Sequence, residues 1–295
     1  MNVSRWIKVN THALGGRTVA ITGATGGLGG AVCRHLLSLG AGLILLDRNR
    51  AKSDALKAAL IGEYPQATIR QIPLDLSDMA SVKAACETLE RETFDVLIHN
   101  AGAYSIPRCI CNTGYDNVFQ INFASPYYMT CRLLPLLRER GGRVVAVGSI
   151  AHNYSKTDAV DVDFRTRKKA SLVYGNAKRY LMYALHELFR DEDRATLAVT
   201  HPGITFTNIT AHYPPLIFAL IKHPMKVIFM SPRRAALSII RGVFEASDYR
   251  SWIGPRWFDV WGVPSVKPLR TAQNEEIARI DRVARGIYDE ILQKR

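Results

Sequence analysis

Short apolar stretches alternate with longer amphipathic stretches along most of the chain, and this alternation limits the fold more than any other feature. The strand-like stretches are residues 19–21, 43–46, 68–73, 95–98, 143–147 and 197–200. Helical patterns stand between and after them, at about 27–39, 50–61, 79–91, 115–138, 171–190 and 232–246. Residues 43–46 are apolar without interruption, as expected of a strand covered on both sides. Repeated strand–helix units predict the doubly wound α/β class, a parallel sheet with helices on both faces.

The 295 residues contain no internal repeat or linker, so the sequence indicates a single domain. We expect an N-terminal tail over 1–16, a catalytic domain over 17–270 and a C-terminal helical tail over 271–295. Within that domain, an apolar, proline-marked insert at about 204–231 is expected to form a flap over the carboxyl edge of the sheet. Its longest uninterrupted apolar part is too short to span a bilayer, although it could lie on one.

The chain is basic, with a formal net charge of +13. Such a balance can indicate nucleic acid, an anionic membrane surface or an anionic ligand. The densest basic cluster lacks interleaved aromatic side chains, so nucleic-acid binding is not expected; it comprises Arg165, Arg167, Lys168 and Lys169. Peripheral contact with a membrane stays open.

The five cysteines have neither zinc-site nor redox-pair spacing, so no metal site is expected; they are Cys33, Cys86, Cys109, Cys111 and Cys131. Residues 1–16 contain no secretory signal pattern. Reduced thiols, together with the absence of a signal pattern in residues 1–16, favour a cytoplasmic protein, either free or peripheral at a membrane surface.

A glycine-rich turn stands between the first strand and the first helix, in Thr22-Gly23-Ala24-Thr25-Gly26-Gly27-Leu28-Gly29. Glycine accepts positive φ and lets a pyrophosphate approach the backbone. The helix that follows points its free amides and the positive end of its dipole at that anion. This placement predicts the dinucleotide loop of a Rossmann-type domain, with a tight turn that binds nothing as the alternative.

Asp47 ends the second strand, where a carboxylate can accept hydrogen bonds from the adenosine ribose hydroxyls. It would repel a 2′-phosphate, whereas the neighbouring Arg48 could bind that phosphate. The glycine turn itself has no Lys or Arg. We therefore expect NAD as the preferred cofactor and NADP as the alternative. A simple helix-capping role is the other interpretation of Asp47.

Tyr174 and Lys178 are four residues apart on a predicted helix, which places them on one face. A free tyrosine has a pKa near 10 and is a poor base at neutral pH. A nearby ammonium and a positively charged nicotinamide would stabilise the phenolate and lower that pKa. Taken alone, such a pair is usually a solvated helix face, so its meaning depends on other motifs.

Those motifs occur together, and in their order along the chain they resemble the short-chain dehydrogenase/reductase family over about residues 15–250. They are the glycine turn, Asp75-Leu76, Asn100-Ala101-Gly102, Asn122, Ser149, Tyr174 with Lys178, and Pro202-Gly203 with Thr205 and Thr207. His99 departs from the family, which usually has Asn there. Within the family, residues 141–189 are most similar to the retinol-dehydrogenase-like group.

The resemblance implies an NAD(P)-dependent oxidoreductase that moves a hydride between the nicotinamide and an alcohol or carbonyl carbon. Tyr174 would be the general acid or base, and Lys178 would lower its pKa and contact the nicotinamide ribose. Ser149 would bind the substrate oxygen, and Asn122 would hold a water that links Lys178 to solvent. Besides Tyr174 and Lys178, the cofactor-binding residues would be Thr22, Gly23, Gly27, Leu28, Gly29, Asp47, Arg48, Asp75, Leu76, Asn100, Ala101, Gly102, Pro202, Gly203, Thr205 and Thr207.

The substrate is expected to be an apolar alcohol or ketone, such as a retinoid, steroid or lipid, because the insert is rich in aromatic and aliphatic residues. Packing of the insert, or a homo-oligomer contact, is the alternative reading of the same residues. Tyr104, Cys109 and Cys111 are expected to border the cleft. Two other functions remain: a non-catalytic dinucleotide sensor, and a membrane-surface or partner-binding protein.

Overall fold

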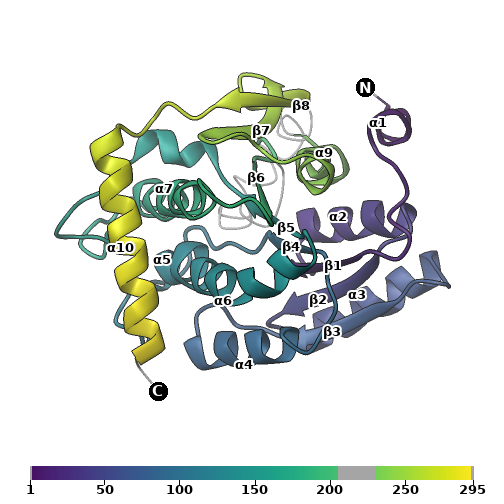
Figure 1. Cartoon of the computed structure of the whole chain (residues 1–295), viewed down its shortest axis with the longest axis horizontal. Coiled ribbons are helices and arrows are strands. Elements are labelled where there is room, and N and C mark those ends of the chain that lie inside the picture. The colour runs from purple at the N-terminus through teal and green to yellow at the C-terminus, as the bar shows by residue number, and fades with distance from the viewer. Residues whose placement is uncertain (1, 205–229, 294–295) are drawn as a thin grey trace, which may run out of the picture.

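An eight-stranded sheet forms the centre of the computed structural model, which describes residues 2–204 and 230–293 (Figure 1). The strand order is β3-β2-β1-β4-β5-β6-β7-β8. Their bounds are β1 Thr18–Thr22, β2 Gly42–Asp47, β3 Ile69–Pro73, β4 Val96–His99, β5 Arg143–Val147, β6 Thr196–Thr200, β7 Ser251–Trp257 and β8 Trp261–Pro268. Strands β1 to β7 are parallel, so their carboxyl ends meet at one edge of the sheet.

Helices cover both faces of the sheet, which confirms the doubly wound α/β class (Figure 1). The helices are α1 Val3–Asn10, α2 Gly27–Ser38, α3 Arg50–Glu63, α4 Met79–Leu89, α5 Asn117–Phe119, α6 Ser125–Glu139, α7 Ala170–Leu188, α9 Pro232–Phe244 and α10 Asn274–Gln293. One apolar core includes residues of α2, α3 and α9, and the other includes residues of α4, α6, α7 and α10. A π-helical segment, Gln120–Ala124, joins α5 to α6, and a 3-10 helix spans Ile150–Tyr154.

The last two strands differ from the sequence expectation, which placed no strand after residue 200. β7 pairs with β6 in parallel through Thr200 and Ile253, and β8 returns antiparallel to β7. The expected parallel sheet thus holds for seven strands, and its eighth strand is antiparallel. The proposed flap lies almost wholly outside the described residues. Its two ends are described, and the backbone N–H of Met230 donates to the carbonyl of Ile204 at 3.1 Å.

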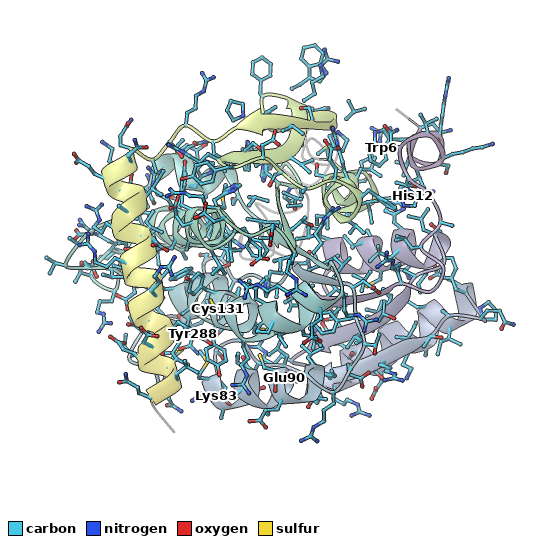
Figure 2. All side chains as sticks on the ribbon, in the orientation of Figure 1. Trp6, His12, Lys83, Glu90, Cys131 and Tyr288 are labelled. Atoms are coloured by element: carbon cyan, nitrogen blue, oxygen red, sulfur yellow. The ribbon has the colours of Figure 1, made fainter. Side chains whose placement is uncertain are left out.

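The segment expected as an N-terminal tail contains α1, which packs on α9. Its Trp6 side chain is buried, and His12 contacts Phe244 of α9 edge-on, with ring centroids 4.6 Å apart. Figure 2 labels both Trp6 and His12 on this side of the molecule. The division of the chain at residues 16 and 271 stays a prediction.

The C-terminal helix α10 is amphipathic, as its sequence predicts, and lies across α6 and α7. Its buried face is formed by Ile277, Ile280, Ala284, Ile287 and Ile291, spaced at three, four, three and four residues. At one end of this contact Tyr288 packs against Tyr128 of α6, with ring centroids 5.6 Å apart. Figure 2 shows Tyr288 of α10 next to Cys131 of α6.

A buried ion pair also fastens α10 to α7. The Arg179 guanidinium contacts both oxygens of the Glu276 carboxylate, at 2.8 and 2.7 Å, and donates to the carbonyl of His152 at 2.9 Å. Glu276 also accepts hydrogen bonds from the backbone N–H and hydroxyl of Thr157. Burial is the largest single influence and would raise the pKa of Glu276, but the hydrogen bonds from Arg179 and Thr157 and the Arg179 charge together outweigh it, and the pKa is lowered. The pair therefore holds together α7, α10 and the loop after β5.

Replacing Glu276 with Gln should lower the free energy of unfolding by about 3 kcal/mol, because the Arg179 charge would stay buried without an opposite charge beside it. Chemical denaturation at neutral pH measures this loss. Asp281→Asn is the matched control, since it breaks the Arg285–Asp281 pair on the exposed side of the same helix and should cost less than about 0.5 kcal/mol. Equal losses in the two variants would contradict the role given to the buried pair.

Candidate functional site

A cavity of about 710 Å³ opens at the carboxyl edge of the sheet, where β1, β4, β5 and β6 end. This is the edge at which doubly wound sheets bind their ligands. The glycine turn and the ends of β2 and β3 line one part of the cavity. The segments after β4, β5 and β6, together with α7, line the other part.

The glycine turn is closed so tightly that only glycine fits at two of its positions. Gly23 has φ of +69°, and a Cβ atom there would lie 2.9 Å from the Cα of Ala101. A Cβ on Gly29 would lie 2.3 Å from the carbonyl oxygen of Gly23. The N-cap of α2 is Gly26, which offers no side-chain hydrogen bond to the first amides of the helix. Those amides are thus available to an anion in the cavity.

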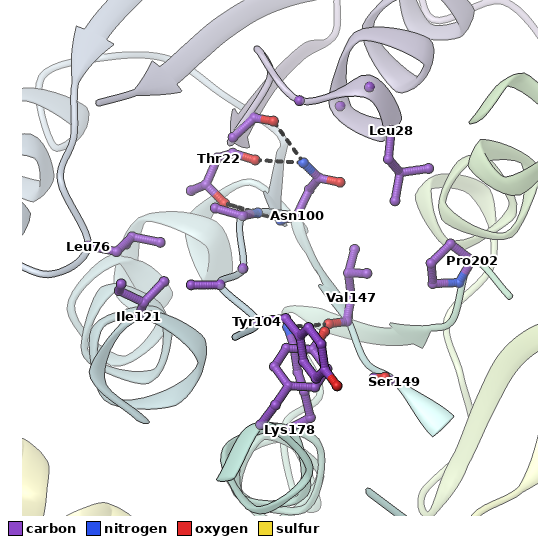
Figure 3. A pocket seen from close by; sticks show the side chains of 18 of the residues that line it. Thr22, Leu28, Leu76, Asn100, Tyr104, Ile121, Val147, Ser149, Lys178 and Pro202 are labelled. Carbon is purple, nitrogen blue, oxygen red and sulfur yellow. Dashed lines mark hydrogen bonds between the residues drawn. The ribbon is translucent and has the colours of Figure 1, made fainter. Parts of the chain in front are cut away.

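Asn100 fixes this turn to the end of β4 (Figure 3). Its side-chain amide donates to the carbonyls of Thr22 and Gly23, both at 3.0 Å. In return, the hydroxyl oxygen of Thr22 accepts from the backbone N–H groups of Asn100 and Ala101, at 3.1 and 3.0 Å. These bonds explain why Asn follows β4 and Thr ends β1, since each satisfies the backbone that the turn leaves unpaired.

Charged side chains gather where β2 and β3 end. The Asp47 carboxylate accepts from the backbone N–H and hydroxyl of Thr25, both at 3.0 Å, so it also holds the glycine turn. Arg48 is largely exposed, and its Nε lies 4.0 Å from the Asp75 carboxylate. Lys52, in the first turn of α3, lines the same end of the cavity.

Three polar side chains meet in the opposite part of the cavity. Ser149 follows β5, and Lys178 lies on α7 (Figure 3). Tyr174 lies one turn before Lys178 on the same helix. The Lys178 ammonium donates to the carbonyl of Val147 at 2.9 Å and lies 5.7 Å from the centroid of the Tyr174 ring. Tyr104, after β4, packs edge-on against Tyr174 with ring centroids 5.4 Å apart.

Burial is the main influence on the pKa values of Tyr174 and Lys178. It raises the pKa of Tyr174 to about 12, although a hydrogen bond with Ser149 acts in the opposite direction. Burial also lowers the pKa of Lys178 to about 8, because the ammonium is taken out of water. From the sequence, Lys178 was expected to lower the pKa of Tyr174. In the protein alone burial is the larger effect, and the Lys178 ammonium is bound to a backbone carbonyl.

Asn122 lies behind the cavity wall and not among its lining residues. It sits in the π-helical segment, where Pro126 has no N–H to donate to the carbonyl four residues earlier, that of Asn122. The Asn122 side chain donates to the carbonyls of Ala103 and Val118, both at 2.8 Å. A Cβ atom on Gly102 would lie 2.8 Å from Asn122 Oδ1 and 3.6 Å from Lys178 Nζ, so both side chains border that glycine.

Nearly all the residues selected from the sequence line this one cavity. The lining includes Thr22, Gly23, Gly27, Leu28, Gly29, Asp47, Arg48, Asp75, Leu76, Asn100, Ala101, Gly102, Ser149, Tyr174, Lys178, Pro202 and Gly203. Tyr104 also lines it as expected, whereas Cys109 and Cys111 do not. Thr205 and Thr207 lie outside the described residues. For all the residues selected from the sequence, the roles in binding and catalysis remain predictions.

Other lining residues were not identified from the sequence, and they include Thr25, Lys52, Ile121, Tyr154, Ser171 and His201. Thr25 carried a usable signal, since it is the one hydroxyl side chain between the first and last glycines of the turn. Within the described ranges, no cluster of three or more His, Cys, Asp or Glu side chains could hold a metal ion. No helix in the described part of the chain has both the length and the apolar character needed to cross a membrane.

Comparison with known proteins shows which family the sequence is similar to. The sequence profile of the short chain dehydrogenase family matches residues 17–160. Retinol dehydrogenase 14 of Mus musculus is 34% identical over 212 residues, which cover 67% of this chain and 64% of that protein. This chain therefore spans less than two thirds of the length of that relative. Retinol dehydrogenase 14 of Homo sapiens is 31% identical over 247 residues, covering 76% and 73%.

The fold also has relatives among solved structures. An uncharacterised protein from Mycobacterium paratuberculosis superposes with a TM-score of 0.73 at 24% identity, covering 94% of this chain and 95% of that one. At this level of identity the likeness concerns the fold alone. It extends over nearly the whole chain.

Proposed function

The chain belongs to the short-chain dehydrogenase family, and on that basis we propose that it transfers a hydride between a nicotinamide dinucleotide and the carbon of an apolar alcohol or ketone. The observation that supports this most strongly is the meeting of Ser149, Tyr174 and Lys178 in the same cavity as the glycine turn. The turn suits a pyrophosphate and the three side chains suit proton transfer. A Tyr174→Phe variant is the direct test of these roles.

The cavity suits a dinucleotide at both of its ends. The uncapped amides of α2 and the absence of side chains at Gly23 and Gly29 leave room and hydrogen-bond donors for the pyrophosphate. Asp47 would take the adenosine ribose, and Asp75 with Leu76 would lie against the adenine. Lys178 would hold the nicotinamide ribose. When bound, the cofactor supplies or accepts the hydride, and the protein aligns the substrate with it.

Proton transfer would be the work of Tyr174. Its high pKa keeps the hydroxyl protonated at neutral pH, which suits a general acid that donates to the substrate oxygen during reduction. The Ser149 hydroxyl would bind the same oxygen, since it already contacts Tyr174. In the reverse direction Tyr174 would accept the proton. Asn122 would hold a water that carries the proton on from Lys178 to solvent.

The rate of reduction should fall as the pH rises above about 8. Lys178 is a cation below that pH and neutral above it, and a cation beside Tyr174 stabilises the phenolate that forms as the proton leaves. We expect kcat/KM for reduction to fall about tenfold per pH unit above that value, which forms the alkaline limb of the pH profile. The Lys178→Arg variant should be slower at every pH, but its kcat/KM should no longer fall in the alkaline limb, because a guanidinium does not titrate there. An unchanged alkaline limb in that variant would contradict the assignment to Lys178.

An apolar substrate is supported by the side chains that line the nicotinamide end of the cavity. Tyr104, Ile150, Tyr154 and Ile204 all face it. Two similar proteins are named as retinol dehydrogenases, which is consistent with this class of substrate. A panel of ketones and alcohols of increasing chain length would test it. Steady growth of kcat/KM with apolar surface supports the proposal, and preference for small polar substrates refutes it.

We favour NAD over NADP as the cofactor because two carboxylates, those of Asp47 and Asp75, line the adenosine end of the cavity. Arg48 is largely exposed, but its Nε lies 4.0 Å from the Asp75 carboxylate, which would compete with a phosphate for the guanidinium. A non-catalytic sensor of the same dinucleotide is the second candidate. It would need the glycine turn but not Ser149, Tyr174 and Lys178 together, so their joint presence favours the enzyme.

A further inference from the structure

Three aromatic side chains are exposed at the turn between β7 and β8. Trp257 is 59% exposed, Phe258 91% and Trp261 44%. Trp257 and Trp261 are cross-strand partners at the end of the hairpin, and Phe258 lies in the turn between them. Exposed apolar residues are common singly, but three large aromatics in five consecutive residues form a patch that calls for a partner. We name these three side chains the aromatic tip.

The aromatic tip lies at the edge of the sheet where the cavity opens. β7 is parallel to β6, so its carboxyl end is at that edge. The His201 ring contacts the carbonyl of Asp259 at 3.0 Å, and a Cβ atom on Gly203 would lie 2.8 Å from the carbonyl of Val260. His201 and Gly203 themselves line the cavity. The tip is thus built onto the segment that borders the cavity.

Cationic side chains lie on the elements that reach this edge of the molecule. Arg256 is exposed next to the tip, and its guanidinium lies 5.6 Å from the centroid of the Trp257 ring. Arg233, in the first turn of α9, donates to Ser4 of α1, so Arg5 and Lys8 follow close by. α9 begins at the same edge, because Pro232 approaches Gly27 of the glycine turn. Among the described residues none of these four cations forms an ion pair.

We infer that the aromatic tip docks the protein on an anionic lipid surface. Aromatic rings flanked by arginine and lysine suit the boundary of a bilayer, where rings enter the apolar region and cations meet the headgroups. A specific protein interface buries about 800 Å² on each partner, and a three-residue turn offers too little surface for that. The net charge of +13 favours an anionic surface over a neutral one.

Tryptophan fluorescence can report this contact directly. The chain has four tryptophans, and Trp6 and Trp252 are buried while the other two belong to the tip. We expect a blue shift when vesicles of phosphatidylcholine with phosphatidylserine are added, and quenching by brominated lipid. Flotation with the same vesicles gives the bound fraction. Pure phosphatidylcholine vesicles and high salt should each weaken binding, because the cations contribute.

Phe258→Asn is the decisive variant. Phe258 has φ of +53°, a conformation that Asn adopts readily, so the turn should persist. Loss of this ring should reduce vesicle binding at least about fivefold. Arg256→Gln should reduce it about fivefold in low salt and little in high salt. Val160→Asn is the matched control, since Val160 is 94% exposed in another loop. This variant should bind vesicles like the wild type.

The outcomes distinguish a lipid surface from a second copy of this chain as the partner of the aromatic tip. Weaker binding in Phe258→Asn with normal binding in Val160→Asn supports the proposal. Equal binding of wild type and Phe258→Asn would overturn it. It would also be overturned if the wild type ignored vesicles and self-associated through the tip, as shown by a Phe258-dependent change in sedimentation. None of these measurements requires turnover, so they stand apart from the test of the enzymatic proposal.

Discussion

A Tyr174→Phe variant is expected to lose at least about a hundredfold in kcat while binding the dinucleotide with nearly unchanged affinity. The substitution removes the hydroxyl that would exchange a proton with the substrate oxygen, and it keeps the ring that packs against Tyr104. Steady-state kinetics with the best substrate of the panel gives kcat, and fluorescence titration gives the affinity for the dinucleotide.

Tyr104→Phe provides the matched control. Tyr104 lines the same cavity and touches Tyr174, but its hydroxyl has no part in the proposed proton transfer. We expect a loss of less than about tenfold in that variant. Near-normal turnover in Tyr174→Phe, or equal losses in both variants, would remove Tyr174 from the proposed chemistry.

An Asp47→Ser variant is expected to reverse the preference for NAD over NADP. The Asp47 carboxylate repels a 2′-phosphate, and its removal would leave Arg48 and Lys52 to attract one. A repulsion of about 2–3 kcal/mol corresponds to a roughly 30- to 150-fold change in the ratio of the two kcat/KM values. Measuring kcat/KM with both cofactors for both proteins tests the expectation.

Asp47 also accepts two hydrogen bonds from Thr25, so the serine variant could disturb the glycine turn as well as the charge. Asp47→Asn separates these effects, because it keeps an acceptor for Thr25 and loses only the charge. It should show the same reversal. Adding Arg48→Gln should then weaken NADP alone. A wild type that already prefers NADP would show that the cations dominate at this end of the cavity.

The doubly wound fold could be predicted from the sequence because its strands are buried on both sides. Residues 43–46 have no polar member, and all of them lie in β2 in the structure. The motifs of the site were predictable for a related reason. Apart from Asn122, Tyr174 and Lys178, they lie at or just after the end of a strand, and parallel strands end at one edge of the sheet, so motifs distant in sequence meet there.

Other features depend on contacts that no local pattern shows. β7 contains Gly254 and Pro255, residues that usually interrupt strands, and it forms because β6 and β8 pair with it. The hydrogen bond that the backbone N–H of Thr25 donates to the Asp47 carboxylate links residues in different elements. The high pKa of Tyr174 arises from burial, which depends on the packing of α7 against the segments after β4 and β5. The spacing of Tyr174 and Lys178 alone could not reveal that burial.

Transfer of isotope from the cofactor tests the central claim most directly. The purified protein would be incubated with an apolar ketone and a reduced nicotinamide dinucleotide deuterated at the transferring carbon, and the alcohol product analysed by mass spectrometry. We expect one deuterium on the carbinol carbon in the wild type, and at least about a hundredfold slower labelling in Tyr174→Phe. Binding of the dinucleotide without any labelled alcohol across the whole substrate panel would contradict it and favour the non-catalytic sensor.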